Sequence, residues 1–179
     1  MPAKTPPNQI AVFSTKLGWM IVCGRDDVLC GLQFGAASEG TAVARLREEY
    51  GDLPELNDWN TDLVVRLQRF AAGEFDDFCD VTVDTTDLSE FSRRVVSQCR
   101  QIPPGETLTY GELAARAGSA AAARAVGRVM ARNRIPLVIP CHRVVGSGGK
   151  LTGFSAPGGC ETKQRLLELE MQMRPVAVA

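Results

Sequence analysis

The sequence is poor in the residues that bind metals and phosphate groups. Its 179 residues include a single histidine, and its six cysteines never form a Cys-x-x-Cys pair. Structural zinc sites usually take four cysteine or histidine ligands from such closely spaced pairs, so we expect no metal site. A glycine-rich GxxxxGK[ST] loop is absent as well. We therefore expect no bound nucleotide and no other cofactor.

The chain also lacks a strong net charge and long apolar runs. Twenty Lys and Arg residues against 21 Asp and Glu residues give a formal net charge of −1 at pH 7. No run approaches the length of a membrane-spanning helix, and residues 1–9 are polar and proline-rich, unlike a signal peptide. We expect a cytoplasmic protein without membrane contact, whose cysteines are reduced.

The charge is distributed unevenly along the chain. The region from 39 to 87 is mostly acidic, whereas the charged residues between 116 and 143 are all basic. They are Arg116, Arg124, Arg128, Arg132, Arg134 and Arg143. The near-neutral total therefore hides a basic face on the second half of the chain.

The first half of the sequence has the pattern of a scaffold. Apolar runs within 10–13, 19–23 and 28–34, separated by turn residues, predict three antiparallel strands. Helices are predicted at 41–50 and after Asn60, which is a suitable N-cap, and alternation at 78–83 predicts a further strand. No catalytic arrangement is visible in residues 1–84.

A polar run at 84–89 indicates a boundary. We expect an N-terminal α/β scaffold domain of residues 1–86, a C-terminal domain of residues 87–174 and a tail of residues 175–179. The predicted fold class is α+β. A small antiparallel N-terminal sheet with helices is followed by a mostly helical, winged-helix-like domain that contains a helix-turn-helix.

The helix-turn-helix is predicted from helix start and stop signals. Thr109 and Glu112 fit a capping box at the start of one helix, and Gly118 suits its end. Ser119 is then expected to cap a second helix over 120–132. Helix, tight glycine turn, helix is the pattern of a DNA-binding unit, although proteins that never meet DNA use it too.

The second of these helices has almost no side-chain bulk except for arginines. Arg124, Arg128 and Arg132 recur every four residues among alanines and Gly127. A slim helix with a basic stripe can approach a nucleic-acid backbone closely. The alternative is a helix packed through its alanines, with arginines that contact only water.

The stretch Ile139–Gly146 contains the only histidine, directly after Cys141. A thiol is a weak nucleophile until it becomes a thiolate, and a nearby imidazole or positive charge favours that form. The apolar run 135–140, bounded by prolines, is expected to be extended and to carry Cys141 to a defined place. The alternative is a small apolar cysteine in a buried strand. A final amphipathic helix is predicted at 161–173.

Taken together, these motifs resemble the O6-alkylguanine-DNA alkyltransferases, also called methylated-DNA–protein-cysteine methyltransferases. The similarity is dense from about Phe91 to Glu170, and in the first half it is only an outline. It is carried by Pro104-Gly105-Glu106-Thr107-Leu108-Thr109-Tyr110, Ala122-Ala123-Arg124-Ala125-Val126-Gly127, Asn133, and Ile139-Pro140-Cys141-His142-Arg143-Val144-Val145-Gly146.

The resemblance implies a repair protein that acts once on double-stranded DNA containing O6-alkylguanine, and also on O4-alkylthymine. The helix-turn-helix would hold the minor groove, and the damaged base would be flipped out of the stack. Cys141 would then accept the alkyl group irreversibly. The protein would act as a monomer, and cooperative binding of several copies to DNA stays open.

The resemblance also assigns the residues of the site by position. His142 would help to deprotonate Cys141 through a water, Glu170 would orient His142, Tyr110 would protonate the leaving guanine, and Asn133 would hold the loop. Arg124 would fill the gap that the flipped nucleotide leaves. The remaining DNA contacts would come from Thr109, Tyr110, Ala122, Ala123, Ala125 and Gly127, and the base pocket would be lined by Val144, Phe154 and Ser155.

Other interpretations of the same residues stay open. Glu170 alone could be a solvated helix acid, and Tyr110 could be a core residue. A damage sensor of the same fold would bind lesions without chemistry, but members of that branch lack the cysteine. A cysteine hydrolase would leave the helix-turn-helix without a role, and a transcriptional regulator would need an effector domain that the sequence does not reveal. Ala156-Pro157 interrupts the usual glycines of the pocket loop, which leaves the accepted alkyl size open.

Overall fold

The computed structural model describes residues 7–51 and 58–173. The predicted tail of residues 175–179 lies outside the described residues, and so do residues 1–6 of the expected N-terminal tail. The chain forms two compact units, which are Met1–Ala72 with Asp80–Asp87 and Gly73–Cys79 with Leu88–Ala179. The boundary that the sequence predicts between the two domains, at residues 86 and 87, stays a prediction.

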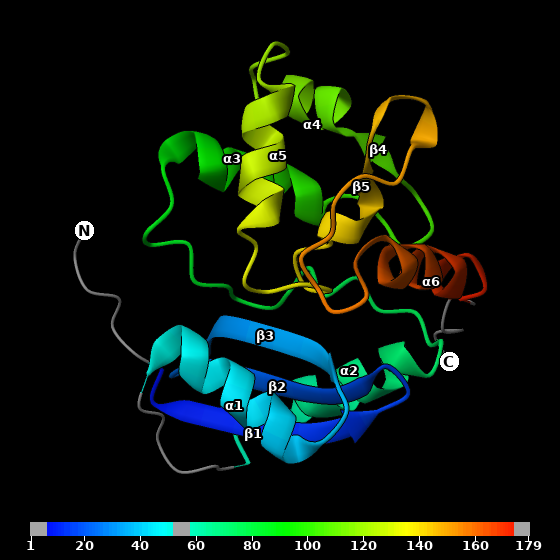
Figure 1. Cartoon of the computed structure of the whole chain (residues 1–179). Coiled ribbons are helices and arrows are strands. Elements are labelled where there is room, and N and C mark those ends of the chain that lie inside the picture. Colours follow the sequence, from blue (N-terminus) through cyan, green and yellow to red (C-terminus); the bar gives the residue numbers. More distant parts are fainter. Residues whose placement is uncertain (1–6, 52–57, 174–179) are drawn as a thin grey trace, which may run out of the picture. The chain divides into compact units, whose positions relative to one another are not determined.

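The first unit is built on a three-stranded antiparallel sheet. The strands are adjacent in chain order and are β1 (Gln9–Thr15), β2 (Gly18–Arg25) and β3 (Val28–Ala36). The consecutive residues Met20, Ile21, Val22 and Cys23 of β2 are all fully buried. Since successive side chains point to opposite faces, both faces of the sheet must be covered. Figure 1 shows helix α1 (Glu39–Tyr50) in front of the sheet and helix α2 (Thr61–Ala71) behind it.

Both helices of this unit begin at a side-chain cap. The backbone N–H of Thr41 donates to Ser38 Oγ at 3.2 Å, and that of Leu63 donates to Asn60 Oδ1 at 3.1 Å. Each cap satisfies an N–H group that has no partner inside the helix. The prediction that Asn60 starts a helix is therefore confirmed.

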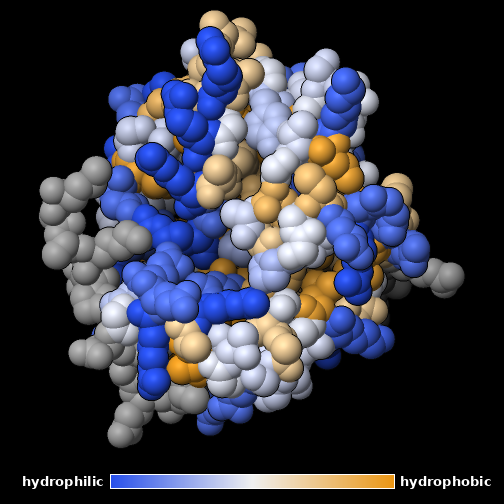
Figure 2. All heavy atoms as spheres, in the orientation of Figure 1, coloured by the Kyte–Doolittle hydropathy of each residue, from blue (hydrophilic) through white to orange (hydrophobic). Residues whose placement is uncertain are grey.

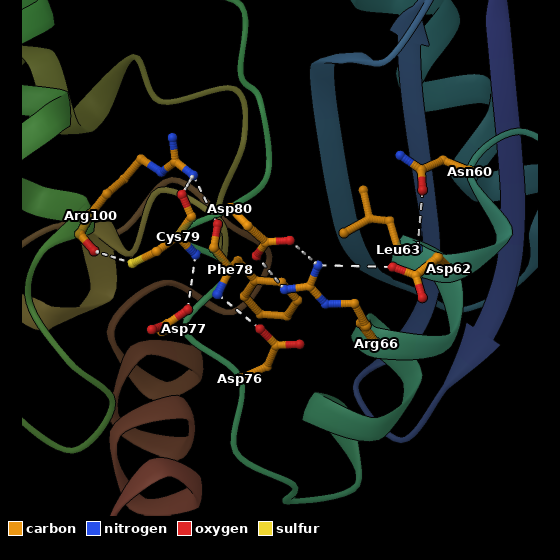
Figure 3. Close-up of polar contacts among 10 residues, drawn as sticks. All are labelled: Asn60, Asp62, Leu63, Arg66, Asp76, Asp77, Phe78, Cys79, Asp80 and Arg100. Carbon is orange, nitrogen blue, oxygen red and sulfur yellow. Dashed lines mark hydrogen bonds and ion pairs between the residues drawn. The ribbon is translucent and has the colours of Figure 1, made fainter. Parts of the chain in front are cut away.

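The strand expected at residues 78–83 does not form, so that prediction is wrong. The backbone N–H groups of Phe78 and Cys79 donate to the carboxylates of Asp76 and Asp77 at 2.8 and 2.9 Å (Figure 3). Phe78 also adopts a left-handed φ of 53°. Short-range bonds of this kind turn the backbone, because the aspartates take N–H groups that a sheet would use. Within this stretch Val83 forms an isolated bridge.

One arginine of each unit binds the segment of residues 78–83, as Figure 3 shows. In the first unit, Arg66 donates from both terminal nitrogens to Asp80, at 2.8 and 2.7 Å. In the second unit, Arg100 donates to the carbonyl groups of Phe78 and Cys79 at 2.8 and 3.1 Å. The alternation of apolar and polar residues therefore reflects a side-chain-anchored loop rather than a strand.

The second unit is mostly helical. Its α-helices are α3 (Glu90–Arg100), α4 (Tyr110–Arg116), α5 (Ala123–Ala131) and α6 (Gly159–Met171). Two short strands, β4 (Leu108–Thr109) and β5 (Val144–Val145), pair in parallel. Their two-residue length leaves no periodic signal, which is why the sequence did not predict them.

Helices α4 and α5 form the predicted helix-turn-helix. The N–H of Glu112 donates to Thr109 Oγ1 at 3.2 Å and the N–H of Thr109 donates to Glu112 Oε2 at 2.7 Å, so the capping box is confirmed. Gly118 has a φ of 86° in the turn, where a side chain would be strained. Ser119 does not cap α5, because its carbonyl accepts from the N–H of Ala122 at 2.9 Å and closes a turn before the helix begins.

These elements give an α+β fold with an N-terminal antiparallel sheet and a helical C-terminal unit, which confirms the predicted fold class. The final helix begins and ends two residues earlier than the sequence indicates. Among the residues that the structure describes, no helix is both long and apolar enough to cross a membrane.

Candidate active site

The Cys141-His142-Arg143 motif occupies one turn of 3-10 helix, η1 (Cys141–Arg143), directly before β5. The run 135–140 that leads to it is not extended, so that expectation is wrong. Leu137 adopts a left-handed φ of 71°, and the N–H of Ile139 donates to the carbonyl of Ile135 at 2.8 Å. Its two prolines have no N–H to give to a sheet and fix their own φ, so the apolar run folds into a turn.

Asn133 ties this turn to the cysteine. Its Nδ2 donates to the carbonyl of Ile139 at 2.8 Å and lies 3.2 Å from Cys141 Sγ, and its Oδ1 accepts from the N–H of Ile135 at 3.0 Å. One amide side chain thus fixes both ends of the turn and donates to the sulfur. This arrangement suits the loop-holding role expected for Asn133.

His142, Arg143 and Glu170 form a buried polar cluster beside Cys141. His142 Nε2 lies 2.7 Å from Glu170 Oε1, and Arg143 donates from Nε and a terminal nitrogen to the same carboxylate at 2.8 to 3.1 Å. Arg143 also donates to the carbonyl of Ile102 at 2.6 Å, and the N–H of Gly105 donates to Glu170 Oε2 at 3.1 Å. Buried charges need such partners, because taking them out of water is costly.

The hydrogen bonds of the cluster set the protonation states of its members. Burial alone raises the pKa of Glu170, but the bonds and charges of His142 and Arg143 outweigh it and lower that pKa to about 2. Burial lowers the pKa of His142, which the carboxylate only partly offsets. An ionised Glu170 accepts a hydrogen bond from His142 Nε2–H, so Nδ1 of the neutral ring carries a lone pair. No described residue donates to Nδ1, which is buried.

The thiol of Cys141 is buried, with 4% of the residue exposed, and it forms part of the wall of a cavity of about 640 Å³. Burial raises the pKa of the Cys141 thiol, and the hydrogen bond from Asn133 and the charge of Lys163 act in the opposite direction. The resting protein therefore holds a protonated, weakly reactive sulfur at the side of a cavity that could admit a flat aromatic ring.

The cavity gathers six residues that the sequence pointed to in addition to Cys141. They are Tyr110, Ala123, Arg124, Gly127, Phe154 and Ser155. The hydroxyl of Tyr110 donates to the carbonyl of Thr152 at 3.4 Å, on the loop that forms one wall. Helix α5 forms another wall, where Ala123 and Gly127 leave room for a ligand.

Several other predicted residues lie outside the cavity lining. Val144 is fully buried, and Thr109 is the N-cap of α4. Ala122 precedes α5 and Ala125 lies within it, both partly exposed. These four residues do not line the cavity, although Val144 donates its backbone N–H to the carbonyl of Cys141. Their predicted contacts with base or DNA stay proposals.

Lys163 is a site residue that the sequence analysis missed. It is fully buried on α6, and its Nζ donates to the carbonyl of Val144 at 2.5 Å and to that of Thr152 at 3.4 Å. The same nitrogen lies 5.9 Å from the centre of the Tyr110 ring. Its spacing in the sequence could have revealed it. Lys163, Leu166 and Glu170 recur at the intervals of one helix face, and all three are buried.

Among residues 7–51 and 58–173, no group of three or more histidines, cysteines or acidic residues is placed to hold a metal ion.

Comparisons with known proteins identify the family. Residues 90–172 match the family described as 6-O-methylguanine DNA methyltransferase, DNA binding domain. A methylated-DNA–protein-cysteine methyltransferase of Mycolicibacterium paratuberculosis is 38% identical over 168 residues, which cover 90% of this chain and 92% of the relative. The chain belongs to the methylated-DNA–protein-cysteine methyltransferase family. The family and the enzyme class predicted from the sequence are thereby confirmed.

Solved structures of the methyltransferase family have the same fold. The crystal structure of Mycobacterium tuberculosis OGT in complex with DNA is 34% identical with a TM-score of 0.68, over 90% of this chain and 92% of that one. The O6-methylguanine-DNA methyltransferase of Pyrococcus kodakaraensis is 25% identical with a TM-score of 0.68, over 90% of this chain and 99% of that one. The likeness to these methyltransferases therefore extends over both units.

Proposed function

We propose that this protein repairs DNA by moving the alkyl group of O6-alkylguanine onto its own Cys141. The observation that carries the proposal is the position of the sulfur, which lines a cavity of about 640 Å³ and adjoins a buried imidazole–carboxylate pair. The names of the relatives support the reaction class, and the relative crystallised with DNA supports DNA as the substrate. O4-alkylthymine is proposed as a second, similar substrate.

In the first step, Cys141 loses its proton. His142 Nδ1 is the acceptor, over one bridging water, because Nε2 is committed to Glu170. The carboxylate stabilises the positive charge that the ring then acquires, which is the nucleophile–base–orienter arrangement of many nucleophilic enzymes. Burial keeps the thiol neutral until a substrate is bound, which limits wasteful oxidation or alkylation of the only acceptor.

In the second step, the thiolate attacks the alkyl carbon. A sulfur–carbon bond forms as the bond between that carbon and guanine O6 breaks, and the electron pair moves into the guanine ring system. Tyr110 donates its hydroxyl proton to the base, so that neutral guanine leaves rather than an anion. The imidazolium returns a proton to Tyr110 through solvent. The proton lost by the thiol thus equals the proton gained by guanine, and no cofactor is consumed.

The cavity requires the base to leave the duplex, since an alkyl group inside stacked DNA cannot reach a buried sulfur. Phe154 and Ser155 would enclose the flipped base, and Val144 would support the floor from behind. Arg124, which is exposed and also lines the cavity, would occupy the gap in the stack. Thr109, Ala122, Ala123, Ala125 and Gly127 would let the helix-turn-helix approach the groove closely.

The thioether product is stable, and nothing in the described cluster offers a route to reverse it. We therefore propose a single-turnover reaction in which each protein molecule repairs one lesion. Such a protein is consumed stoichiometrically, which distinguishes it from a catalyst that turns over.

The test is to incubate the protein with a duplex that carries one O6-methylguanine and to measure the mass of the peptide that contains Cys141. We expect one methyl group per protein on this peptide and none on Cys141→Ser. Cys160→Ser, which changes an exposed cysteine of the same unit, is the matched control and should react as the wild type does. If the Cys141 peptide stays unmodified while the lesion is still bound, the protein is a sensor and not a methyltransferase.

A further inference from the structure

The loop of residues 151–158, which leads into α6, forms one wall of the cavity. Its residues Thr152, Gly153, Phe154 and Ser155 all line the cavity. In Figure 1 the loop is the orange segment before α6. It contains no charged residue, and in Figure 2 the surface between α5 and α6 is mostly white and pale orange. Because the loop has no charged side chain that could hold it by an ion pair, its position depends on how its two ends are attached.

The first end of the loop is attached through Thr152. The carbonyl of Thr152 accepts one hydrogen bond from Lys163 Nζ on α6 and another from the hydroxyl of Tyr110 on α4, each at 3.4 Å. Tyr110 would leave this carbonyl when it donates its proton to a bound base. Lys163, which is fully buried, would then still hold the loop at this end.

The second end of the loop is attached through Thr162. Its Oγ1, in the first turn of α6, donates to the carbonyl of Pro157 at 2.5 Å. Gly158 lies between these groups with a left-handed φ of 83°, and a Cβ at this position would lie 2.3 Å from Thr162 Oγ1. A glycine is therefore needed for the hydroxyl to reach the carbonyl. Because Pro157 also fixes its own φ and restricts the backbone of Ala156, this end of the loop is stiff while the bond holds.

The wall of the cavity that α5 forms cannot easily move outward. Val126 and Met130 of this helix are buried in the core, which fixes its position. A substituent on guanine O6 that is larger than methyl must therefore gain room on the side of the loop. The segment that has to yield is 153–156, which lies between the two carbonyls that are held, those of Thr152 and Pro157.

We propose that Thr162 is a positioning residue that sets the size of the alkyl group that the protein accepts. Its bond to Pro157 resists the outward movement of the loop, so that methyl is transferred more readily than longer alkyl groups. The inference rests on the proposed function, since it takes O6-alkylguanine as the substrate. Thr162 is not part of the cavity lining, so it acts on the base through the backbone of the loop.

The test compares duplexes that carry one O6-methylguanine or one O6-butylguanine, because these two groups differ only in chain length. The second-order rate constant for alkylation of Cys141 is measured for each duplex by weighing the Cys141 peptide in quenched samples. Thr162→Val keeps the shape of the side chain but cannot donate a hydrogen bond. The net strength of one hydrogen bond corresponds to a factor of about 2 to 12. The butyl-to-methyl ratio of the rate constants should therefore rise about 2- to 12-fold in Thr162→Val, through faster butyl transfer.

Two control variants separate this bond from other effects. Thr162→Ser retains the hydroxyl and should keep the wild-type ratio. Arg165→Gln, at an exposed position of the same helix, should leave both rate constants unchanged. Hydrogen–deuterium exchange gives a second measurement, since the amides of residues 151–158 should exchange faster in Thr162→Val but not in Thr162→Ser. Unchanged exchange or an unchanged ratio in Thr162→Val, or an equal fall of both rate constants, would overturn the inference.

The wild-type protein distinguishes this inference from the proposed function. Transfer of methyl to wild-type Cys141, together with an unchanged ratio in Thr162→Val, would refute the role of Thr162 alone. If wild-type Cys141 accepts neither group, the proposed alkyl transfer fails, and the control of alkyl size that rests on it fails as well.

Discussion

Replacing Glu170 with glutamine should destabilise the protein severely, although the change preserves the shape of the side chain. The carboxylate accepts hydrogen bonds from His142 Nε2, from two nitrogens of Arg143 and from the N–H of Gly105. Glutamine offers one acceptor oxygen and places an NH₂ group among these donors. The fully buried guanidinium of Arg143 would then lack a counter-charge.

The magnitude can be worked out in two ways. Removing one partner of a buried ion pair costs about 3 to 5 kcal/mol of unfolding free energy. The pKa of Glu170 is lowered from 4.5 to about 2, and this shift alone corresponds to about 3 kcal/mol. For a chain of this length, 1 kcal/mol shifts the melting temperature by about 2 to 4 °C. We therefore expect Glu170→Gln to melt about 10 °C below the wild type.

The pH dependence follows from the direction of the shift. Because the pKa of Glu170 is lower in the folded protein than in the unfolded chain, the unfolded chain binds more protons between pH 4.5 and about pH 2. The stabilisation is complete above about pH 4.5 and is lost as the pH falls through the folded value. The difference in stability between wild type and Glu170→Gln should therefore shrink over that window.

The assay is urea unfolding at neutral pH and at several acid pH values, followed by fluorescence and circular dichroism. Glu168→Gln is the matched control, since Glu168 lies on the same helix but is exposed and bonded only to Gln164 among the described residues. It should change the unfolding free energy by less than about 0.5 kcal/mol. If Glu170→Gln unfolds within about 1 kcal/mol of the wild type, the buried cluster does not stabilise the fold as argued.

Three further predictions concern the cavity. Lys163→Met should lower the unfolding free energy by about 1 to 3 kcal/mol, because the buried carbonyl of Val144 loses its donor. It should also shift the pH profile of alkyl transfer to higher pH, because the charge of Lys163 lowers the pKa of Cys141. Lys163→Arg should recover part of both effects, and an unmoved profile in a folded Lys163→Met would contradict the electrostatic role. Gly127→Ala should raise the unfolding free energy by about 1 kcal/mol, because alanine favours the helix over glycine and the added Cβ would meet the Tyr110 ring at an ordinary 4.0 Å. It should also slow the transfer of large alkyl groups relative to methyl, because the cavity becomes narrower. Equal slowing of both groups would refute a local narrowing of the cavity. Because burial raises the pKa of Cys141, the transfer rate should keep rising with pH above neutrality. Because burial lowers the pKa of His142, protonation of this base should add to the loss of rate only below the ordinary histidine pKa of about 6.5. A plateau below pH 7 would show that the thiolate forms more readily than its burial indicates.

The parts of the fold that the sequence predicted are those with local signals. Strands with buried runs, the Asn60 cap and the Thr109–Glu112 capping box depend on neighbouring residues, so pattern and spacing were sufficient. The failures at 78–83 and 135–140 have a common cause. In both, residues with strong turn chemistry, aspartates in one and prolines in the other, override an apolar pattern that a strand would also show.

The site divides in the same way. The nucleophile, the histidine and the cavity residues of α4 and α5 lie in compact motifs that can be recognised one by one. The positions of Lys163 and Arg143 in the buried site cannot be recognised in this way. Their partners are backbone carbonyls and a carboxylate that lie far away in the sequence. The only sequence signal for Lys163 is its spacing, because Lys163, Leu166 and Glu170 share one buried face of α6.

Helix α5 has three tasks: it packs into the core, it lines the cavity and it presents arginines on the surface. Its composition follows from these tasks. A nine-residue helix offers only two or three residues for each task, so Val126 and Met130 alone supply its buried apolar contacts. Its first turn has no side-chain cap, and its small residues along the cavity are alanine and glycine, which contribute little burial. The helix is therefore held mainly by its neighbours α3 and α4 rather than by its own sequence. Any enlargement of Ala123, Gly127 or Ala131, which line the cavity, should therefore impair base entry even when it raises stability.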